Sequence, residues 1–358
     1  LTEERDQITA MNTSFTLHKD LSDGVPGAHL LTYGLDLDLE RVESERISGG
    51  TASALARFPD DAHVLRAGLF VQDERDLGSG VSILAGLRPQ ISIHDAALLD
   101  PDFGTSGLDA DLDEVYSGLA GGVSLSWVAT PDLDVILGAH RSFRAPNFED
   151  VGSSDESFGG LTNGADDSVE LPSTDMDPEF GNELELGLRW MSPRGLTASV
   201  FGFRTGIEDV IERTFVQFAN SGADGDGNGS PDLAEVQKKN VGDARIHGLE
   251  GSVEMPLGRD WDLGLSGAWT VGHQWSDSNP ALNDVPFRRI PPLRGLASLH
   301  HTFSDTLWGS VEWEVAAKQD RLHPADIDDV RIPVGGTPGY GVVHLRSGGR
   351  VSGTTRWT

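Results

Sequence analysis

Residues Leu31–Glu40 read Leu-Thr-Tyr-Gly-Leu-Asp-Leu-Asp-Leu-Glu, so apolar and polar side chains alternate along the segment. Successive side chains of a β-strand point to opposite faces, and a period of two therefore predicts a strand with one apolar and one polar face. The same alternation recurs in Glu183–Trp190, Trp261–Trp269 and Leu307–Val315. The abundance of glycine (44 residues) and the scarcity of helical periodicity also favour an all-β fold.

The connections between the expected strands are short and long in turn. The short ones are Asp76–Gly80, Thr130–Asp134, Ser192–Gly195, Pro256–Asp260 and Ser304–Thr306. The long ones are Ser44–Asp61, Leu99–Glu114, Arg144–Gly181, Asn220–Glu235, His273–Arg288 and Gln319–Pro338. A compact soluble domain seldom holds so many long loops. Short periplasmic turns and long extracellular loops are typical of a transmembrane antiparallel β-barrel, and the sequence predicts this architecture.

The composition excludes several classes of protein. The chain has 27 Lys+Arg against 57 Asp+Glu, a net charge of −30, which argues against binding to nucleic acid phosphates. It has no Cys, so disulfides and thiolate sites are impossible. It has no apolar run of transmembrane-helix length, which a barrel with alternating strands does not need. No nucleophile elbow, zinc-protease, P-loop or dinucleotide motif occurs, and we do not expect an enzyme.

One segment resembles a known family. Phe143-Arg144-Ala145-Pro146-Asn147, followed by Glu149-Asp150, is similar to the FRAPN…ED segment of TonB-dependent receptors. Other stretches resemble the family in the same order: Gly68–Glu74, Asp177-Pro178-Glu179 with Asn182–Gly187, Asn240–Glu250, Arg289–Gly295 and Gly336–Tyr340. The resemblance covers nearly the whole chain. It implies a siderophore- or haem-type receptor whose barrel is blocked by a plug domain and energised by the TonB complex.

The expected strands are too few to close such a barrel. We expect about thirteen strands, whereas large plugged transporters have 22 and single-chain bacterial barrels have even numbers. Residues 1–358 are therefore interpreted as one partial receptor barrel, from which the plug domain and the C-terminal strands are absent. The chain also begins without a Met or a signal peptide.

Some residues of the motifs have a predictable structural role. Pro146 and Pro178 cannot donate to a β-ladder, so they mark strand ends. Arg144 lies in an acidic region and is expected to form a salt bridge at the barrel rim. Gly248 and Gly251 indicate a crowded or strongly twisted strand.

A candidate calcium loop lies between residues 224 and 235. Its spacing matches the template in which carboxylate and amide oxygens and a final bidentate Glu surround the ion. Pro231 departs from the template, and no helix is expected before the loop. The alternative is a solvated, acidic loop tip. The proposed ligands are Asp224, Asp226, Asn228, Ser230, Asp232 and Glu235.

Histidines offer a second candidate ligand set. Haem receptors that resemble this chain tend to carry a His in the loop after the FRAPN segment, but none lies between His140 and His247. His63, His273 and His323 lie in other expected long loops and are the candidate haem or metal ligands. A lone loop His is more often simply exposed. The long loops concentrate carboxylates rather than the Lys and Arg that an anionic catecholate complex would require.

These observations lead to one main interpretation and two alternatives. The main one is a receptor in the cell outer membrane of a Gram-negative bacterium for TonB-energised uptake of an iron chelate, an iron–siderophore or haem-like compound, or another scarce metal-containing substrate. Its partners would be outer-membrane lipid and, through the plug, the TonB complex. The alternatives are a passive porin-like or structural barrel and a soluble, calcium-dependent β-protein. The polar residues expected to line the lumen are Asp36, Asp38, Glu40, Glu183, Glu185, Glu312 and Glu314.

Overall fold

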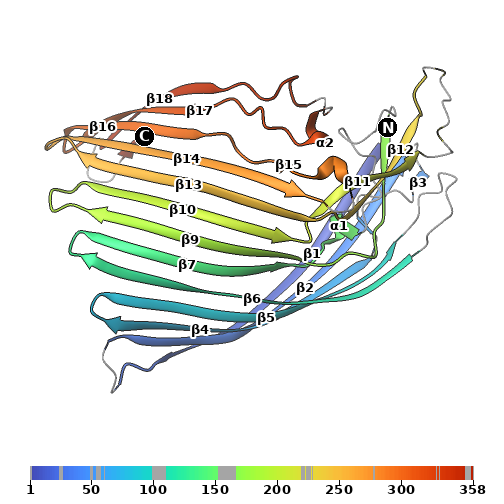
Figure 1. Cartoon of the computed structure of the whole chain (residues 1–358), viewed down its shortest axis with the longest axis horizontal. Coiled ribbons are helices and arrows are strands. Elements are labelled where there is room, and N and C mark those ends of the chain that lie inside the picture. The colour runs from blue at the N-terminus through green and yellow to red at the C-terminus, as the bar shows by residue number, and fades with distance from the viewer. Residues whose placement is uncertain are drawn as a thin grey trace.

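The fold is a single large antiparallel sheet that curls around a central space (Figure 1). The computed structural model describes residues 2–23, 27–48, 51–53, 58–59, 61–98, 110–151, 167–218, 222, 227, 229–276, 279–327, 329, 331–350 and 356–357. Within them, 16 strands belong to this sheet. Its path is β1 (Thr2–Asp20), β2 (His29–Ser48), β4 (Ala62–Gly78), β5 (Val81–Leu98), β6 (Ala110–Thr130), β7 (Leu133–Arg144), β9 (Glu179–Met191), β10 (Thr197–Glu208), β13 (Asp243–Pro256), β14 (Trp261–Trp275), β16 (Arg294–Ser304), β17 (Leu307–Ala316), β18 (Tyr340–Arg350) and β19 (Arg356–Trp357). β3 (Thr51–Ser53) pairs with β2, and β15 (Val285–Pro286) pairs with β14.

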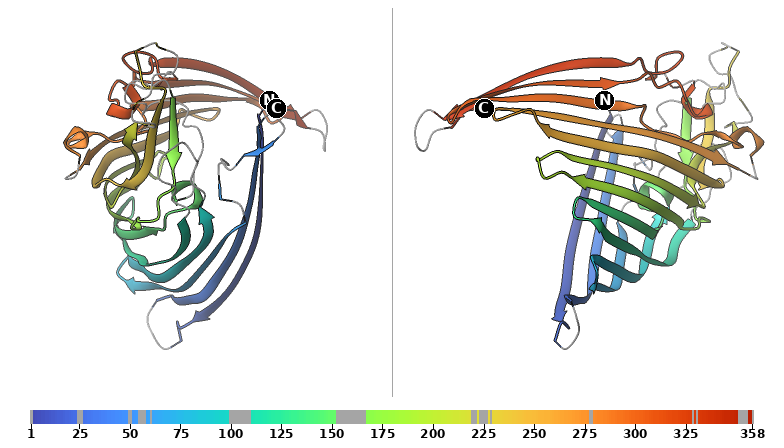
Figure 2. Two further views of the ribbon diagram at one scale, coloured as in Figure 1. Left: turned by 90° about the vertical axis from the view of Figure 1, so that its right-hand side faces the viewer. Right: turned by 60° about the vertical axis from the view of Figure 1, so that its left-hand side comes forward.

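The two ends of this sheet differ as the sequence predicts. Tight turns such as Ser79-Gly80 and Pro131-Asp132 join the strands at one end, on the left of Figure 1. The connections that carry α1, α2 and the second sheet leave from the other end, which by the barrel convention is extracellular. Figure 2 shows the blue N-terminal strands and the red C-terminal strands at the two edges of the curled sheet. Among the described residues no pairing joins these edges, so the sheet is an open barrel wall.

A second sheet lies at the extracellular end, and one of its strands falls within the predicted loop Arg144–Gly181. It consists of the hairpin β11 (Ile211–Phe218) and β12 (Leu233–Asn240), with β8 (Asp167–Leu171) parallel to β12. The expected loop Asn220–Glu235 is therefore too long, since β12 already begins at Leu233. The short helices are α1 (Phe148–Val151), η2 (Pro280–Leu282) and α2 (Pro324–Ile327). No helix in the described part of the chain is long and apolar enough to cross a bilayer.

The hydrophobic core of the extracellular end forms where α1 packs on the wall. Phe148 and Val151 of α1 are buried against side chains near the extracellular ends of β2, β4, β5 and β6. The wall residues of this cluster are Val42, Ala62, Val64, Ala96 and Leu112, and Met176 joins them from the segment before β9. Because α1 directly follows β7, this core fixes the segment after the strand against the inside of the wall.

The wall has an apolar outward face and a polar inward face. Leu35, Leu37 and Leu39 of β2 remain 42%, 36% and 43% exposed, as expected for side chains that face lipid. The interleaved carboxylates face inward and pair with arginines of β4 and β5. Arg88 NH1 lies 2.6 Å from Asp36, and Arg66 NH1 lies 3.0 Å from Asp38 and 2.7 Å from Glu40.

Several glycines of the wall lie beneath aromatic rings. In register across adjacent strands, Phe70 faces Gly34, Phe201 faces Gly187 and Phe203 faces Gly248. A β-carbon at any of these glycines would collide with the facing ring. Gly248 is therefore crowded, as the sequence predicts. Gly251 is less crowded, because its β-carbon would meet only the Ser199 carbonyl oxygen, at 3.3 Å.

Candidate functional site

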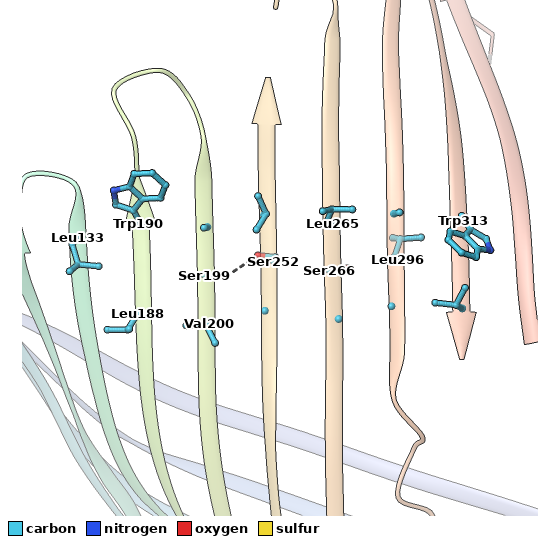
Figure 3. Close-up of a pocket in the computed structure, with 17 residues that line it drawn as sticks. Leu133, Leu188, Trp190, Ser199, Val200, Ser252, Leu265, Ser266, Leu296 and Trp313 are labelled. Atoms are coloured by element: carbon cyan, nitrogen blue, oxygen red, sulfur yellow. Dashed lines mark hydrogen bonds between the residues drawn. The ribbon is translucent and has the colours of Figure 1, made fainter. Parts of the chain in front are cut away.

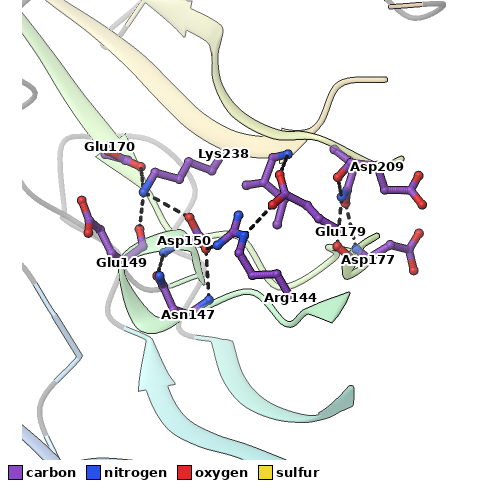
Figure 4. Close-up of polar contacts among 11 residues, drawn as sticks. Arg144, Asn147, Glu149, Asp150, Glu170, Asp177, Glu179, Asp209 and Lys238 are labelled. Carbon is purple, nitrogen blue, oxygen red and sulfur yellow. Dashed lines mark hydrogen bonds and ion pairs between the residues drawn. The ribbon is translucent and has the colours of Figure 1, made fainter. Parts of the chain in front are cut away.

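Residues of the FRAPN segment end β7 and enter a polar network at the extracellular rim (Figure 4). Arg144 Nε donates to Glu179 Oε2 at 2.5 Å, and its NH1 donates to Asp150 Oδ2 at 2.6 Å. The Asn147 side-chain oxygen accepts from the Asp150 backbone N–H at 2.9 Å, which caps the short helix α1. The predicted salt bridge of Arg144 is confirmed. Pro146 lies two residues after the end of β7, and Pro178 lies directly before β9, so both mark strand ends as predicted.

The second and third family-like motifs meet the first in the same network. Glu179 Oε1 accepts from the backbone N–H of Ile211 at 2.7 Å, so one carboxylate joins β7, β9 and β11. The Asn240 amide donates to the carbonyl oxygens of Asp177 at 2.9 Å and of Asp209 at 2.6 Å, and its oxygen accepts from the Asp177 N–H. Three stretches that are far apart in sequence thus meet at one point of the rim.

Lys238 of β12 extends the network to the second sheet. Its ammonium donates to the Glu149 carbonyl oxygen at 2.7 Å and lies 3.5 Å from Asp150 and 3.7 Å from Glu170. Glu170 is almost fully buried and also pairs with Arg213. Burial raises the pKa of Glu170, and the charges of Arg213 and Lys238 partly oppose that rise. The two cations offset part of the free-energy cost of burying this carboxylate. Their contacts also connect the second sheet to the segment after β7.

A cavity of about 640 Å³ lies on the inner wall beside this network. Phe143, Arg144 and Pro146 line one side of it, and the Phe143 ring lies against Gly118 of β6. The opposite side carries paired charges and polar groups of the wall strands: Asp36, Asp38, Arg66, Arg88, Gln90 and Ser92. Both signs of charge are present, so the arrangement suits a polar ligand or chain segment rather than an apolar one.

The calcium loop remains a prediction. Asp224, Asp226 and Asn228 lie outside the described residues. Glu235 belongs to β12, is fully buried, and accepts a hydrogen bond from Gln217 Nε2 at 2.7 Å, whereas Ser230 and Asp232 precede the strand. Among the described residues, no group of three or more His, Cys, Asp or Glu side chains is placed to hold a metal ion.

The three candidate histidines occupy separate surroundings. His63 Nε2 lies 3.3 Å from Asp61, and His273 Nδ1 lies 3.0 Å from Asp284. His323 is buried; its Nδ1 accepts from the Ala325 backbone N–H, and its Nε2 lies 3.5 Å from Glu212. His63 and His273 are about half exposed and remain candidate ligands, whereas burial makes His323 inaccessible in this conformation.

Glu170, Arg213 and Lys238 are not predicted as site residues from the sequence. Glu170 and Arg213 lie in segments with many charged neighbours, so nothing distinguishes them in sequence. Lys238-Lys239 is a pair of cations in a chain with a large acid excess, and it could have indicated a basic anchor for carboxylates.

Replacing Arg144 with methionine should loosen the second sheet without unfolding the wall. The change leaves Asp150 and Glu179, 11% and 16% exposed, without this cation. We expect a local loss of about 1 kcal/mol, at the low end for charged hydrogen bonds because the Arg144 side chain is 44% exposed. Amide hydrogen exchange in β11 and β12 should accelerate about fivefold. Arg141→Met is the matched control, because Arg141 contacts Asn182 at 2.7 Å, Glu208 at 3.5 Å and the Phe180 ring, all on wall strands. Equal exchange in both variants would refute the anchoring role.

A family model described as "TonB dependent receptor-like, beta-barrel" matches residues 2–358. No curated protein sequence matches the chain.

Among solved structures, the copper transporter OprC superposes with a TM-score of 0.76 at 18% identity, covering 99% of this chain and 50% of its own. A double mutant of the Serratia marcescens hemophore receptor HasR, in complex with its hemophore HasA and heme, gives 0.71 at 16%, covering 98% and 55%. The Pseudomonas aeruginosa siderophore receptor PirA gives 0.66 at 15%, covering 97% and 52%. The chain spans about half the length of these proteins, and at such identities the likeness shows the fold alone.

Proposed function

This chain belongs to the TonB-dependent receptor-like β-barrel family, and on that premise we propose that it forms the barrel wall of an outer-membrane receptor that imports a scarce metal-containing substrate with energy from the TonB complex. The family consists of receptors and transporters of the Gram-negative outer membrane. Three neighbouring structures are described as a copper transporter, a siderophore receptor and a hemophore receptor. Iron chelates are therefore the first substrates to test, and copper and haem the next.

The observation that carries this proposal is the rim network beside the polar inner cavity. The network fixes α1 and the second sheet at the extracellular end, and the cavity below them is lined by charged side chains of both signs. A substrate that arrives from outside would meet these elements before reaching the lumen. The net charge of −30 favours a cationic or metal-bearing ligand over a free anionic one.

Uptake measurements distinguish this proposal from a passive barrel. Deleting the gene should abolish growth on one of a panel of ferric siderophores, haemin or copper salts as sole metal source, and the full-length gene should restore it. Inactivating TonB in the complemented strain should abolish that growth again. The protein should be recovered in the outer-membrane fraction and show heat-modifiable gel migration. Growth that depends on the gene but not on TonB would contradict energised uptake and favour the porin-like alternative.

A further inference from the structure

The cavity on the inner wall has a polar lining that continues behind its surface. Grooves on the outward face, such as the one in Figure 3, are lined mainly by apolar side chains. In the inner cavity, Ser92 of β5 is a lining residue, and its Oγ lies 2.8 Å from Nε2 of His94. Tyr116 of β6 is the register partner of Ser92. The lining of the cavity is therefore continuous with two polar side chains behind it.

These two side chains are buried, and each has a polar atom without a partner. His94 is 1% exposed and Tyr116 is 5% exposed. Their rings lie edge to face, with centroids 5.2 Å apart. Within the described residues, neither Nδ1 of His94 nor the hydroxyl of Tyr116 has a hydrogen-bond partner. Most buried polar atoms in proteins are hydrogen-bonded, so two unpartnered atoms on rings in contact indicate a place for a polar group.

The short helix α1 covers this pair. The Phe148 ring lies 5.6 Å from the His94 ring, centroid to centroid, and Phe148 and Val151 are buried in the core cluster beneath α1. The helix has four residues and directly follows Ala145 to Asn147, which line the cavity. Movement of α1 away from the wall would therefore open the pair to the same cavity.

Polar contacts at the rim hold α1 in its closed position. Arg144 and Lys238 lie 2.6 Å and 3.5 Å from the Asp150 carboxylate, and the Asn147 side chain caps the helix (Figure 4). Arg144 also lines the cavity. Breaking these contacts leaves the strand ladders of the wall intact, and such short elements open with free energies below that of global unfolding.

The charges around the pair favour a neutral occupant. Arg66 lies near His94 and disfavours a cation. The Tyr116 hydroxyl both donates and accepts, and Nδ1 of His94 does one or the other according to the tautomer. A hydroxyl or an amide group matches these atoms without carrying a charge. Three carboxylates lie around Tyr116 and disfavour an anion: those of Glu114, Asp150 and Asp177.

We propose that α1 is a lid over a subsite of the inner cavity, in which His94 and Tyr116 bind a neutral hydroxyl or amide group of the substrate. Burying the pair without partners costs free energy, which the burial of Phe148 and Val151 offsets in the closed position. An occupant that bonds to the pair favours the open position. In naming the substrate as the occupant, the inference rests on the function proposed above.

Amide hydrogen exchange of the purified full-length protein measures the lid. The N–H groups of Asp150 and Val151 both bond to the Asn147 carbonyl oxygen, so their exchange reports opening of α1. The double variant His94→Leu/Tyr116→Phe removes both polar groups at similar volume. Its closed lid buries no unpartnered atom of the pair, so exchange should slow about tenfold. Equal or faster exchange would show that the pair does not oppose closure and would overturn the proposal.

Further variants separate the lid from a general change in stability. Tyr340→Phe is the matched control, because it removes a hydroxyl that donates to Glu314, and exchange at α1 should stay at the wild-type rate. Phe148→Ala removes the main apolar contact of α1 and should accelerate exchange about tenfold. Heat-modifiable migration shows that each variant is folded. If the double variant does not fold, Tyr116→Phe alone should still slow exchange about threefold.

A small probe tests the occupant. N-methylacetamide offers one donor and one acceptor without a charge. At a concentration that leaves exchange in β11 and β12 unchanged, it should accelerate exchange at α1 about threefold in the wild type and not in the double variant. Tetramethylammonium chloride and sodium acetate should not do so. An equal response to the charged probes, or none in the wild type, would overturn the subsite. These measurements require no uptake, so failure of the growth test would contradict the proposed function alone.

Discussion

Replacing Gly248 with valine is expected to lower the free energy of unfolding of the barrel by about 3 kcal/mol, the upper part of the usual range for overpacking. A β-carbon at this position would lie 2.6 Å from the Trp269 carbonyl oxygen and 2.7 Å from Phe203 Cζ. The ring could rotate away, but the backbone oxygen belongs to the β13–β14 ladder and cannot move without breaking it. Urea unfolding in lipid vesicles, followed by heat-modifiable migration, measures the loss.

The control is Gly267→Val on the neighbouring strand. Its β-carbon would meet no atom closer than 3.4 Å, so its effect should be below about 1 kcal/mol. Combining Gly248→Val with Phe203→Ala should recover only the part of the loss that the ring causes. If both valine variants unfolded at the same urea concentration, crowding at Gly248 would not be the cause.

Acidification is expected to loosen the extracellular segment that carries α2. His323 is buried among Glu212, Gln274, Arg288 and Asp326, the polar groups of the elements packed around it. Its Nδ1 accepts from the Ala325 N–H, so the neutral ring carries its proton on Nε2, which points toward Glu212. Burial, and then the Arg288 charge, lower the pKa of His323 to about 4, while Asp326 opposes that change.

The sign of the pH effect follows from this lowered pKa. Below the ordinary pKa of 6.5 the unfolded segment takes up a proton that the folded one does not accept until about pH 4, so stability falls as pH falls between these values. The full loss is roughly 3 kcal/mol. Burial also raises the pKa of Glu212, which therefore binds its proton earlier in the folded state and offsets part of the loss at the acid end.

Amide hydrogen exchange of residues 317–327 between pH 7 and pH 4.5, corrected for intrinsic exchange rates, measures this local loss of stability. His323→Gln has no titrating group at this position and should flatten the pH profile. His63→Gln changes an exposed histidine and serves as the control. A profile for His323→Gln that still falls toward acid as steeply as the wild type would assign the loosening to another group.

The barrel wall could be predicted from the sequence because its signals are local. Alternation in Leu31–Glu40 and the order of short and long connections are properties of neighbouring residues, and the structure confirms both. The second sheet has no such signal, since β8 and β12 pair in parallel across a long stretch of chain. Glu235 illustrates the same limit: its spacing fits a calcium template, but spacing does not reveal that the side chain is buried in β12.

Only part of the candidate site could be predicted from the sequence, for a related reason. Arg144, Asp150 and Glu179 lie in stretches that resemble the family, whereas Lys238, which contacts Asp150, lies just before the resembling stretch that begins at Asn240. Gly248 and Gly251 support the same expectation in sequence, although they lie on opposite faces of β13 and, of the two, Gly248 alone lies beneath an aromatic ring. Facing and register are tertiary properties, and period-two patterns alone do not assign them to lipid or lumen.

The parallel pairing of β8 with β12 also sets an order of events during folding. Pairing of neighbouring wall strands closes short loops. Met191 of β9 and Thr197 of β10, for example, are six residues apart in the sequence (197 − 191). Pairing of Asp167 in β8 with Leu233 in β12 instead closes a loop of 66 residues (233 − 167). The entropy of closure rises with loop length, and distant contacts form slowly. The strands β9 and β10 should therefore pair before β8 pairs with β12. The second sheet should be the last part of this region to gain protection against proteolysis.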